Sequence, residues 1–394
     1  DHYANKRVRL SGDMLAELLR VHLMIFLRDL THNIQKLKRK ERKISLRAIT
    51  RSTLLSARIE SAIATGSWIG ERKGVTQNID ATNYLAKLSQ LLRVVSTLST
   101  DQENFEARTL HPTQYGRLCP VETPEGTPIG LRKNLALLAR VTTEPRFDEK
   151  SLLNNLKQFG LQLEIGYLEE GHYDVMLNGK FIGIVKQPEE FVKAVRQARR
   201  QGKIYRDLSI RLNDKVQCIE IRTDAGRVVR PLIIVENGQP KLTDDVLEKV
   251  KTNAMTWQQL IEQGIIEYID ANEEENALVA LSKEEITPEH THLEIDPVAM
   301  FGLVTALVVY ANHEQSARLM RGSKTQKQAL GIYAANYLTL LNTDVSVLHY
   351  PQKPLVRSFV YDYVKFYPAG QNMIVAIAPY YGYNMEDAIV MNKG

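Results

Sequence analysis

The chain has 394 residues, a length that favours several domains over a single hydrophobic core. Apolar residues make up 44% and charged residues 25% of the sequence, which is typical of globular proteins and excludes a disordered or collagen-like chain. The formal net charge of +5 is too small to indicate nucleic acid as the partner, so the distribution of charge along the chain is more informative than the sum.

Cysteine usage and hydropathy exclude two further classes. The only cysteines are Cys119 and Cys218, with no C-x-x-C, so we expect a reducing, cytosolic protein with no zinc site within these residues. The longest apolar run, at 298–310, is shorter than the about 20 residues that span a membrane, so no membrane partner is expected. The chain begins at Asp1 without a signal pattern, and we expect it to be a portion of a longer protein.

The first ninety-odd residues are predicted to be mainly helical. Apolar periodicity predicts one helix over 11–37, a second over 45–64 that stops at Gly66, and a third over 84–95. The segment 67–80 between the last two contains two glycines and mixed charges, which indicates a loop.

Charge is distributed unevenly. Residues 36–58 contain nine Lys or Arg against the single acid Glu41, and this segment is able to face a polyanion. Residues 262–296 contain eleven acids against Lys283, and we expect these acids on an outer surface. For both segments a solvated face is the simpler explanation.

The middle of the chain contains turn and strand signals. The segment 109–134 holds four prolines and three glycines and is predicted to be a loop. Asn178-Gly179 predicts a β-hairpin over 173–185, and a helix is expected over 188–201. Residues 216–235 are interpreted in the same way, with a turn at 224–226 between two strands.

Towards the C-terminus, Asp296-Pro297 predicts the start of a buried helix, because Asp can cap a helix and Pro is tolerated at its first position. The apolar run at 371–379 predicts a buried strand that ends near the carboxylate pair Glu386-Asp387.

Two groups of residues are candidates for binding a metal ion or a phosphate. Glu386-Asp387 suits a hard divalent cation, which prefers carboxylate oxygens, although most adjacent acid pairs are simply solvated. The segment 312–328 gathers four cations that could bind triphosphate oxygens; an exposed basic helix is the alternative. The sequence contains no Walker-type phosphate loop, H-E-x-x-H zinc motif or G-x-S-x-G elbow.

Residues 107–135, ARTLHPTQYGRLCPVETPEGTPIGLRKNL, resemble the fork-region signature of the second-largest, β-like subunit of multisubunit DNA-directed RNA polymerases. The sequence is closer to the archaeal and eukaryotic form than to the bacterial one, and the resemblance implies an internal portion, or one half of a split gene product, of an archaeal-type subunit. The resemblance extends to the segments 1–7, 61–68, 222–236, 267–276, 349–356 and 382–393.

The resemblance implies a mixed α and β, multidomain fold, with a helical fork region followed by two α+β external domains. The implied divisions are the end of the protrusion region at 1–52, the fork region with two fork loops at 53–140, external domain 1 at 141–215, external domain 2 at 216–290, and the incomplete start of the active-site and hybrid-binding region at 291–394.

The same resemblance implies site residues. Asp387, with Glu386 beside it, would lie near the second catalytic Mg²⁺, an ion shared with the largest subunit. Arg318 would reach the nucleotide triphosphate, and Lys327 and Gln328 would line the RNA 3′ end and the hybrid. The two fork loops would be 67–77 and 96–108, and the candidate DNA-binding cations are Lys73, Arg93, Arg108, Arg117 and Arg132.

The implied partners are the largest subunit and other polymerase subunits, the DNA template, nascent RNA and nucleoside triphosphates, in the cytoplasm or a eukaryotic nucleus. The chain would be a nucleotidyltransferase only within such a complex.

Many eukaryotic relatives have S-P-R-N-T-Y where this chain has residues 316–321, which leaves the local backbone geometry open. The alternative is a non-catalytic nucleic-acid-binding or assembly module; a single-strand binding domain is disfavoured because 36–58 has no aromatic residue.

Overall fold

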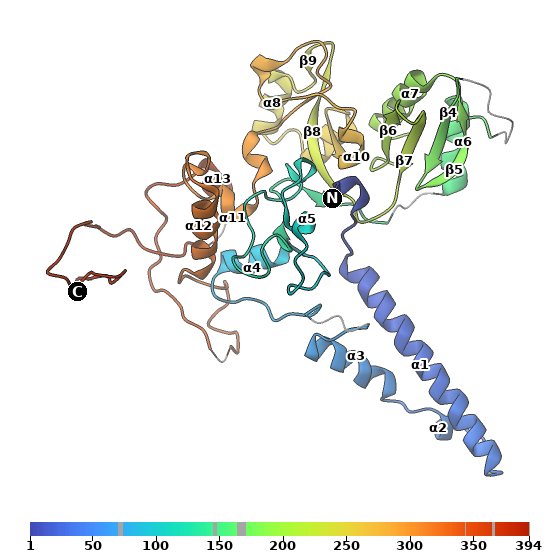
Figure 1. The fold of residues 1–394 in the computed structure, drawn as a ribbon, viewed down its shortest axis with the longest axis horizontal. Helices are drawn as coiled ribbons and strands as arrows, with labels where there is room; N and C mark the ends of the chain where they lie inside the picture. The colour runs from blue at the N-terminus through green and yellow to red at the C-terminus, as the bar shows by residue number, and fades with distance from the viewer. Residues whose placement is uncertain (70–73, 145–147, 164–170, 343, 365–366, 394) are drawn as a thin grey trace.

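The computed structural model describes residues 1–69, 74–144, 148–163, 171–342, 344–364 and 367–393. Figure 1 shows a projecting helical arm, two regions built on β-sheets, and a region of short helices and long loops. The prediction of a mixed α and β, multidomain fold is confirmed. None of the described helices is both long enough and apolar enough to cross a membrane.

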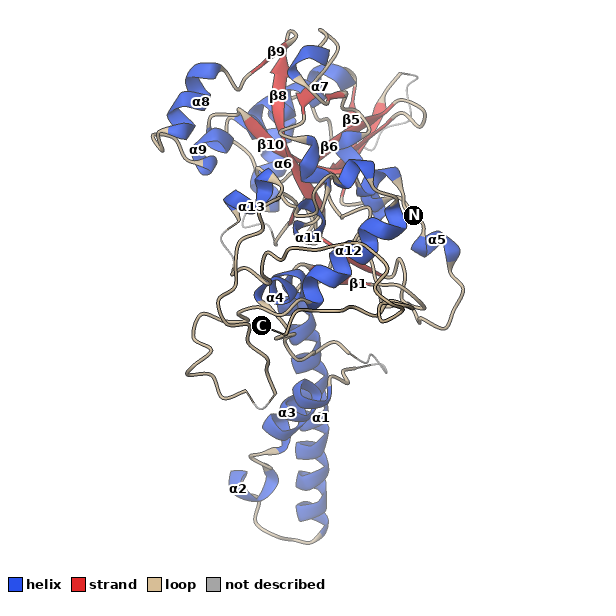
Figure 2. Cartoon of the chain, turned by 90° about the vertical axis from the view of Figure 1, so that its left-hand side faces the viewer, coloured by secondary structure: helices blue, strands red, loops and turns tan. Residues whose placement is uncertain are grey.

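The arm is formed by α1 (Ser11–Arg39), α2 (Leu46–Ile49) and α3 (Leu54–Thr65), and follows the short helix η1 (Tyr3–Asn5). The prediction of the first helix is confirmed, and Leu18 is buried where α3 packs against it (Figure 2). The predicted single helix over 45–64 is wrong, because Thr50–Thr53 separates α2 from α3; Thr50, Ser52 and Thr53 in this segment are weak helix formers. Helix α3 ends as expected at Gly66, whose φ is +70°.

The first sheet has the strand order β5-β4-β7-β6 and packs with α6 (Glu149–Gln158) and α7 (Pro188–Arg200) around one apolar core. Strands β4 (Tyr173–Leu177) and β5 (Lys180–Val185) form the predicted hairpin, since Asn178 and Gly179 both adopt the positive φ of a two-residue turn. The remaining strands are β6 (Ser209–Asn213) and β7 (Cys218–Arg222).

The second sheet is centred on β8 (Val228–Glu236), which is buried along all but its last residue. It pairs with β10 (Ile266–Asp270), β12 (His292–Leu293), β3 (Arg140–Val141) and β9 (Gln239–Pro240), and β12 pairs with β11 (Val279–Ala280). The helices of this region are α8 (Asp244–Lys251), α9 (Trp257–Glu262), α10 (Ala271–Glu274) and η3 (Lys283–Glu285).

The turn at 224–226 does not join a hairpin. Strand β7 on one side belongs to the first sheet, and β8 on the other belongs to the second, so this segment is the connection between two sheets. The division expected at residue 216 falls before β7, inside the first sheet. Turn residues in the sequence cannot indicate whether the strands they separate pair with one another.

The third region contains α4 (Tyr84–Leu91), a two-stranded ladder of β1 (Arg93–Val95) and β2 (Arg132–Asn134), α5 (Phe105–Arg108) and η2 (Pro112–Gln114). Its later elements are η4 (Pro297–Met300), α11 (Leu303–Ala306), η5 (Ala311–His313), α12 (Ser316–Gln328) and α13 (Phe359–Tyr363). Leu85, Val304 and Val360 share its core.

Two helix predictions in this region are wrong. The pattern over 84–95 is helical only to Leu91, because 93–95 pairs with β2. The Asp296 carboxylate does cap as expected, accepting a hydrogen bond from the Val298 amide at 2.8 Å, but it starts only the short η4. The chain is extended at Phe301 and Gly302 and becomes helical again in α11, which is buried.

Candidate functional site

Helix α12 carries the cations that the sequence singled out. Its inner side holds Leu319 and Ser323, and the Ser323 hydroxyl lies 3.1 Å from the Thr305 hydroxyl of α11. On its outer side Arg318 and Arg321 are exposed, and neither makes an ion pair or a side-chain hydrogen bond in the part of the chain that the structure describes. The inner side of the helix is therefore held by packing, and its outer side presents two free guanidinium groups.

The later turns of α12 contact the motif loop around 119–130. The Lys327 Nζ lies 3.1 Å from Oε1 of Glu122, a buried carboxylate that also accepts a hydrogen bond of 2.9 Å from Ser89. Lys324 and Glu125 form an exposed pair at 3.2 Å. The charge of Lys327 is thus paired with an acid of this chain. Gln328, predicted to line the same RNA and hybrid site, is exposed.

The carboxylate pair lies apart from this helix. Glu386 and Asp387 are exposed in a C-terminal segment that runs away from α12 in Figure 1, and no hydrogen bond or ion pair links either to Arg318. The predicted buried strand at 371–379 is wrong: the segment has no regular structure, and Ile374 and Ile377 are fully exposed, because nothing in the described chain covers them.

A cation site is not complete within the described residues. They contain no group of three or more His, Cys, Asp or Glu side chains arranged to hold a metal ion. Glu386 and Asp387 supply at most two carboxylates, which matches the protein contribution that Mg²⁺ usually accepts, with the remaining ligands coming from elsewhere.

Two predicted DNA-binding cations share one face. In the β1–β2 ladder Arg93 lies opposite Asn134 and Arg132 opposite Val95, so the two arginines are diagonal neighbours. Arg108 is engaged differently, since its guanidinium donates to the carbonyls of Thr100, Gln102, Thr127 and Ile129 and so binds one part of the loop region to another. Lys73 lies outside the described residues.

The prediction for Arg117 is wrong in this structure. Its side chain is 1% exposed and forms an ion pair with Glu274 at 2.5 Å. It also donates hydrogen bonds to the carbonyls of Val228 and Ile269, at 3.1 and 3.2 Å. The guanidinium is enclosed by the second sheet and cannot reach a phosphate at the surface.

The acids of 262–296 do not all face outwards as expected, and several belong to a buried ionic cluster between the two sheets. Arg199 of α7 lies 2.6 Å from Glu267 and 2.5 Å from Glu273, and all three side chains are less than 10% exposed. Glu267 also pairs with Arg200 at 2.6 Å and with His292 at 2.9 Å. Arg199 and Arg200 come from α7, which packs on the first sheet, whereas the acids and His292 belong to the second sheet and its helix α10, so the cluster joins the two regions.

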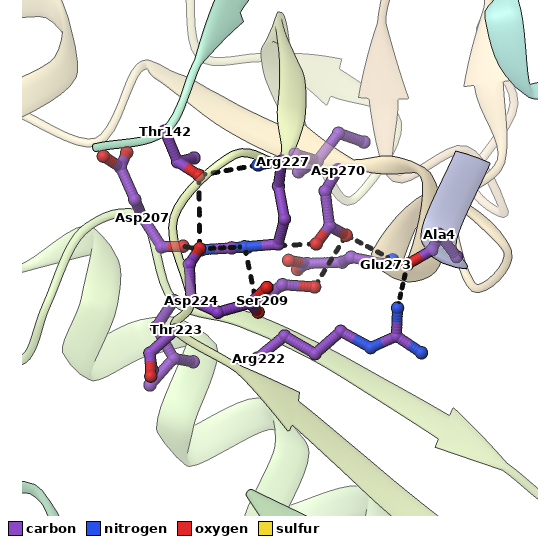
Figure 3. Close-up of polar contacts among 12 residues, drawn as sticks. Ala4, Thr142, Asp207, Ser209, Arg222, Thr223, Asp224, Arg227, Asp270 and Glu273 are labelled. Carbon is purple, nitrogen blue, oxygen red and sulfur yellow. Dashed lines mark hydrogen bonds and ion pairs between the residues drawn. The ribbon is translucent and has the colours of Figure 1, made fainter. Parts of the chain in front are cut away.

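A second node of the cluster lies at the connection from β7 to β8 (Figure 3). Arg227 donates to the Asp270 carboxylate at 3.0 Å and to the Asp207 carbonyl at 2.6 Å. The Ser209 hydroxyl of β6 donates to the same carboxylate at 2.7 Å, and Asp270 also caps α10 through the Glu273 amide at 2.9 Å. One buried carboxylate is therefore held from both sheets.

The pKa values follow from this pairing. Burial alone would raise the pKa of Glu267, but Arg199, the hydrogen bond from His292 and Arg200 outweigh it and hold that pKa well below its usual value. Burial would also raise the pKa of Asp270, but the charge of Arg227 and the hydrogen bond from Ser209 outweigh burial, so this pKa is lowered as well. Both carboxylates are ionised at neutral pH.

Sequence reasoning missed this cluster. The available signal was that Glu267 and Asp270 belong to the strand-like run Ile266–Asp270, and that Arg230 lies inside the run that forms β8, which Arg227 precedes. Charged residues inside apolar strands require partners, because an unpaired buried charge is costly. The partner Arg199 lies in α7, about 70 residues earlier in the chain, and its identity emerges only from the tertiary structure.

Four family models match the chain in order. They describe RNA polymerase Rpb2 domain 3 at residues 77–141, domain 4 at 175–236, domain 5 at 257–297 and domain 6 at 304–394.

Curated relatives match over the whole chain. The chain is 45% identical to the DNA-directed RNA polymerase subunit Rpo2 of Saccharolobus shibatae. It is 36% identical to the RNA polymerase III subunit RPC2 of Schizosaccharomyces pombe and 32% identical to the RNA polymerase II subunit RPB2 of Encephalitozoon cuniculi. In each case it spans about 35 or 36% of the relative's own length. Because successive Rpb2 domain models and full-chain identity agree, the chain belongs to the family of second-largest subunits of DNA-directed RNA polymerases, of which it is a portion.

Proposed function

We propose that this chain, within a second-largest subunit, contributes to nucleotide addition by a DNA-directed RNA polymerase and to binding of the DNA template and the RNA–DNA hybrid. The observation that carries the proposal is α12, which is anchored to the motif loop by Lys327 and Glu122 and presents Arg318 and Arg321 without an acidic partner in the described chain. Free guanidinium groups on a fixed helix suit the oxygens of a triphosphate.

Arg318 would bind the triphosphate of the incoming nucleotide by charge-assisted hydrogen bonds. In this role it would offset the negative charge that develops on the departing pyrophosphate. The contacts of Ser323 with Thr305 and of Lys327 with Glu122 would act by positioning, since they hold the helix in one rotation. Lys327 and Gln328 would lie towards the RNA 3′ end.

Glu386 and Asp387 would contribute carboxylate oxygens to a Mg²⁺ ion shared with the largest subunit. Such an ion supplies charge stabilisation for phosphoryl oxygens. Because the C-terminal segment is exposed in this chain, we propose that contacts with other parts of the subunit or the complex bring the pair to the nucleotide.

Arg93 and Arg132 remain our candidates for DNA contact, together with Lys73; such contacts would go to phosphates, since a polymerase must accept any sequence. Arg108 would act on the same surface mainly by holding its loop. The remaining proposals are the other polymerase subunits, nascent RNA and nucleoside triphosphates as partners, a cytoplasmic or nuclear location, and the division into protrusion, fork, external and hybrid-binding regions.

A second function is favoured by one observation. The structure does not bring Glu386 and Asp387 to Arg318, as would also be expected of a non-catalytic nucleic-acid-binding or assembly module with the same architecture.

Single-nucleotide addition on an RNA–DNA scaffold distinguishes the two. A polymerase rebuilt with the complete subunit is compared with its Arg318→Ala form across nucleotide concentrations. Loss of one charged contact costs about 1.5–3 kcal/mol, so the apparent nucleotide affinity should fall about 10- to 150-fold. Arg28→Ala, which removes an exposed arginine of α1, is the matched control. Unchanged concentration dependence contradicts the role of Arg318, and a complex that binds the scaffold without extending it supports the non-catalytic module.

A further inference from the structure

The far end of the helical arm carries a concentrated positive charge that the proposed function does not use. We define the basic tip as the exposed cations between the end of α1 and α2: Lys38, Arg39, Lys40, Arg42, Lys43 and Arg47. Glu41 is the only acid in this segment. Figures 1 and 2 show the tip at the end of the arm, remote from the two sheets.

The charges of the basic tip are not balanced within the described chain. None of its six cations forms an ion pair there, in contrast to Arg51, which lies 3.6 Å from Asp29 just beyond the tip. Six like charges in ten residues repel one another, and a bound polyanion would relieve this repulsion. Its condensed counterions would be released on binding, which favours the complex further.

The helix dipole does not account for the tip. A cation stabilises the negative end of a helix only within its last turn, and Lys38 and Arg39 occupy that position in α1. Arg42 and Lys43 lie beyond the end of α1, where its dipole gives no stabilisation, and Arg47 lies in the single-turn helix α2.

The tip suits a phosphate backbone rather than exposed bases. No Phe, Tyr, Trp or His occurs within residues 38–47, so the tip itself has no ring on which a base could stack. Helix α1 extends roughly 44 Å at 1.5 Å per residue, which is enough to reach nucleic acid at a distance from the rest of the chain.

We propose that the basic tip binds the phosphate backbone of double-stranded nucleic acid through about three or more simultaneous contacts, independently of nucleotide addition. The choice of nucleic acid as the polyanion rests on the proposed function; an acidic protein is the competing partner.

The test measures the affinity of the rebuilt polymerase for an RNA–DNA scaffold with long duplex DNA arms as salt is raised. The variant K38Q/K40Q/K43Q removes three tip charges. Each lost phosphate contact lowers the slope of log affinity against log salt by about 0.9, so the slope should fall by about 2.7. Between 50 and 200 mM salt the wild type should then lose roughly 40-fold more affinity than the variant.

Two controls isolate the tip. The variant K38R/K40R/K43R keeps the charge and should keep the slope, and K157Q/K180Q/K249Q removes three exposed lysines elsewhere and should also leave it unchanged. A slope that stays at the wild-type value in K38Q/K40Q/K43Q overturns the proposal in favour of another partner.

The same assay separates this proposal from the proposed function. Nucleotide addition on a scaffold trimmed of its duplex arms should be equal in the wild type and the tip variant. If neither the wild type nor the tip variant extends the scaffold, the proposed role in nucleotide addition is contradicted. The dependence of affinity on salt still decides whether the tip binds duplex.

Discussion

Arg199 joins the two sheet regions through buried ion pairs. It lies in α7 against the first sheet, but its guanidinium is bound by Glu267 and Glu273 of the second, with a further hydrogen bond of 2.7 Å to the Leu208 carbonyl. Arg199→Met keeps most of the buried volume and removes only the charge and the donors. We expect this change to destabilise the contact between the sheets more than either sheet itself.

The loss in free energy of unfolding depends on which cations still contact Glu267 and Glu273 after the substitution. Removing one partner of a buried ion pair costs about 3–5 kcal/mol, because the other charge is left without compensation. Here Arg200 and His292 still contact Glu267, and Arg196 lies 3.2 Å from Glu273. Since each carboxylate keeps a cation, we expect the lower end of this range, about 3 kcal/mol.

Urea unfolding followed by circular dichroism and by tryptophan fluorescence measures the loss. We expect a lower midpoint and two separated transitions, because the sheets would no longer unfold together. Arg9→Met is the matched control: it breaks an exposed pair with Glu17 at 2.6 Å and should cost less than about 1 kcal/mol. A loss for Arg199→Met no larger than that of the control would refute the reasoning that buried charge joins the sheets.

Four further results are expected. The pKa of Glu267 is held low in the folded chain, so its ionised form stabilises the fold above pH about 4, and this stabilisation is lost as the pH is lowered further. The urea concentration at the unfolding midpoint should therefore decrease when the pH is lowered below about 4, and a midpoint that does not change with pH contradicts this. Asn83→Ala removes the cap of α4 and two hydrogen bonds to the end of α12, and should cost about 1–3 kcal/mol in urea unfolding. Gly226→Ala places a Cβ 2.6 Å from the Val8 carbonyl at a φ of +84°, and should cost about 1–3 kcal/mol, whereas Gly12→Ala, which meets nothing within 4 Å, should not lower stability. Asp387→Ala should slow nucleotide addition most at low Mg²⁺, and wild-type rates across a Mg²⁺ titration would exclude a metal-binding role.

The parts that the sequence predicted correctly depend on neighbours along the chain. The periodic leucines of α1, the Asn178-Gly179 turn, the Pro-initiated helix α7 and the cap at Asp296 are all set by residues within one or two turns. The polymerase resemblance was also available in the sequence, because long motifs are preserved as continuous strings.

The parts that failed depend on contacts between distant segments. Arg117 lies in a Pro- and Gly-rich loop, so the sequence predicts a surface cation. Its burial depends on an ion pair with Glu274, which lies 157 positions later in the chain. The apolar run at 371–379 has the composition of a strand, but a strand needs a partner, and the described chain provides none.

The sequence by itself determined the first helix of the arm, the Asn178-Gly179 hairpin, helix α7 and the family. Only the tertiary structure decided which charges are buried and which are free, because the cost of burying a charge is offset by a partner that any distant segment can provide. Arg199 and Arg318 are both helical arginines in the sequence; the fold encloses one between two sheets and leaves the other exposed on α12.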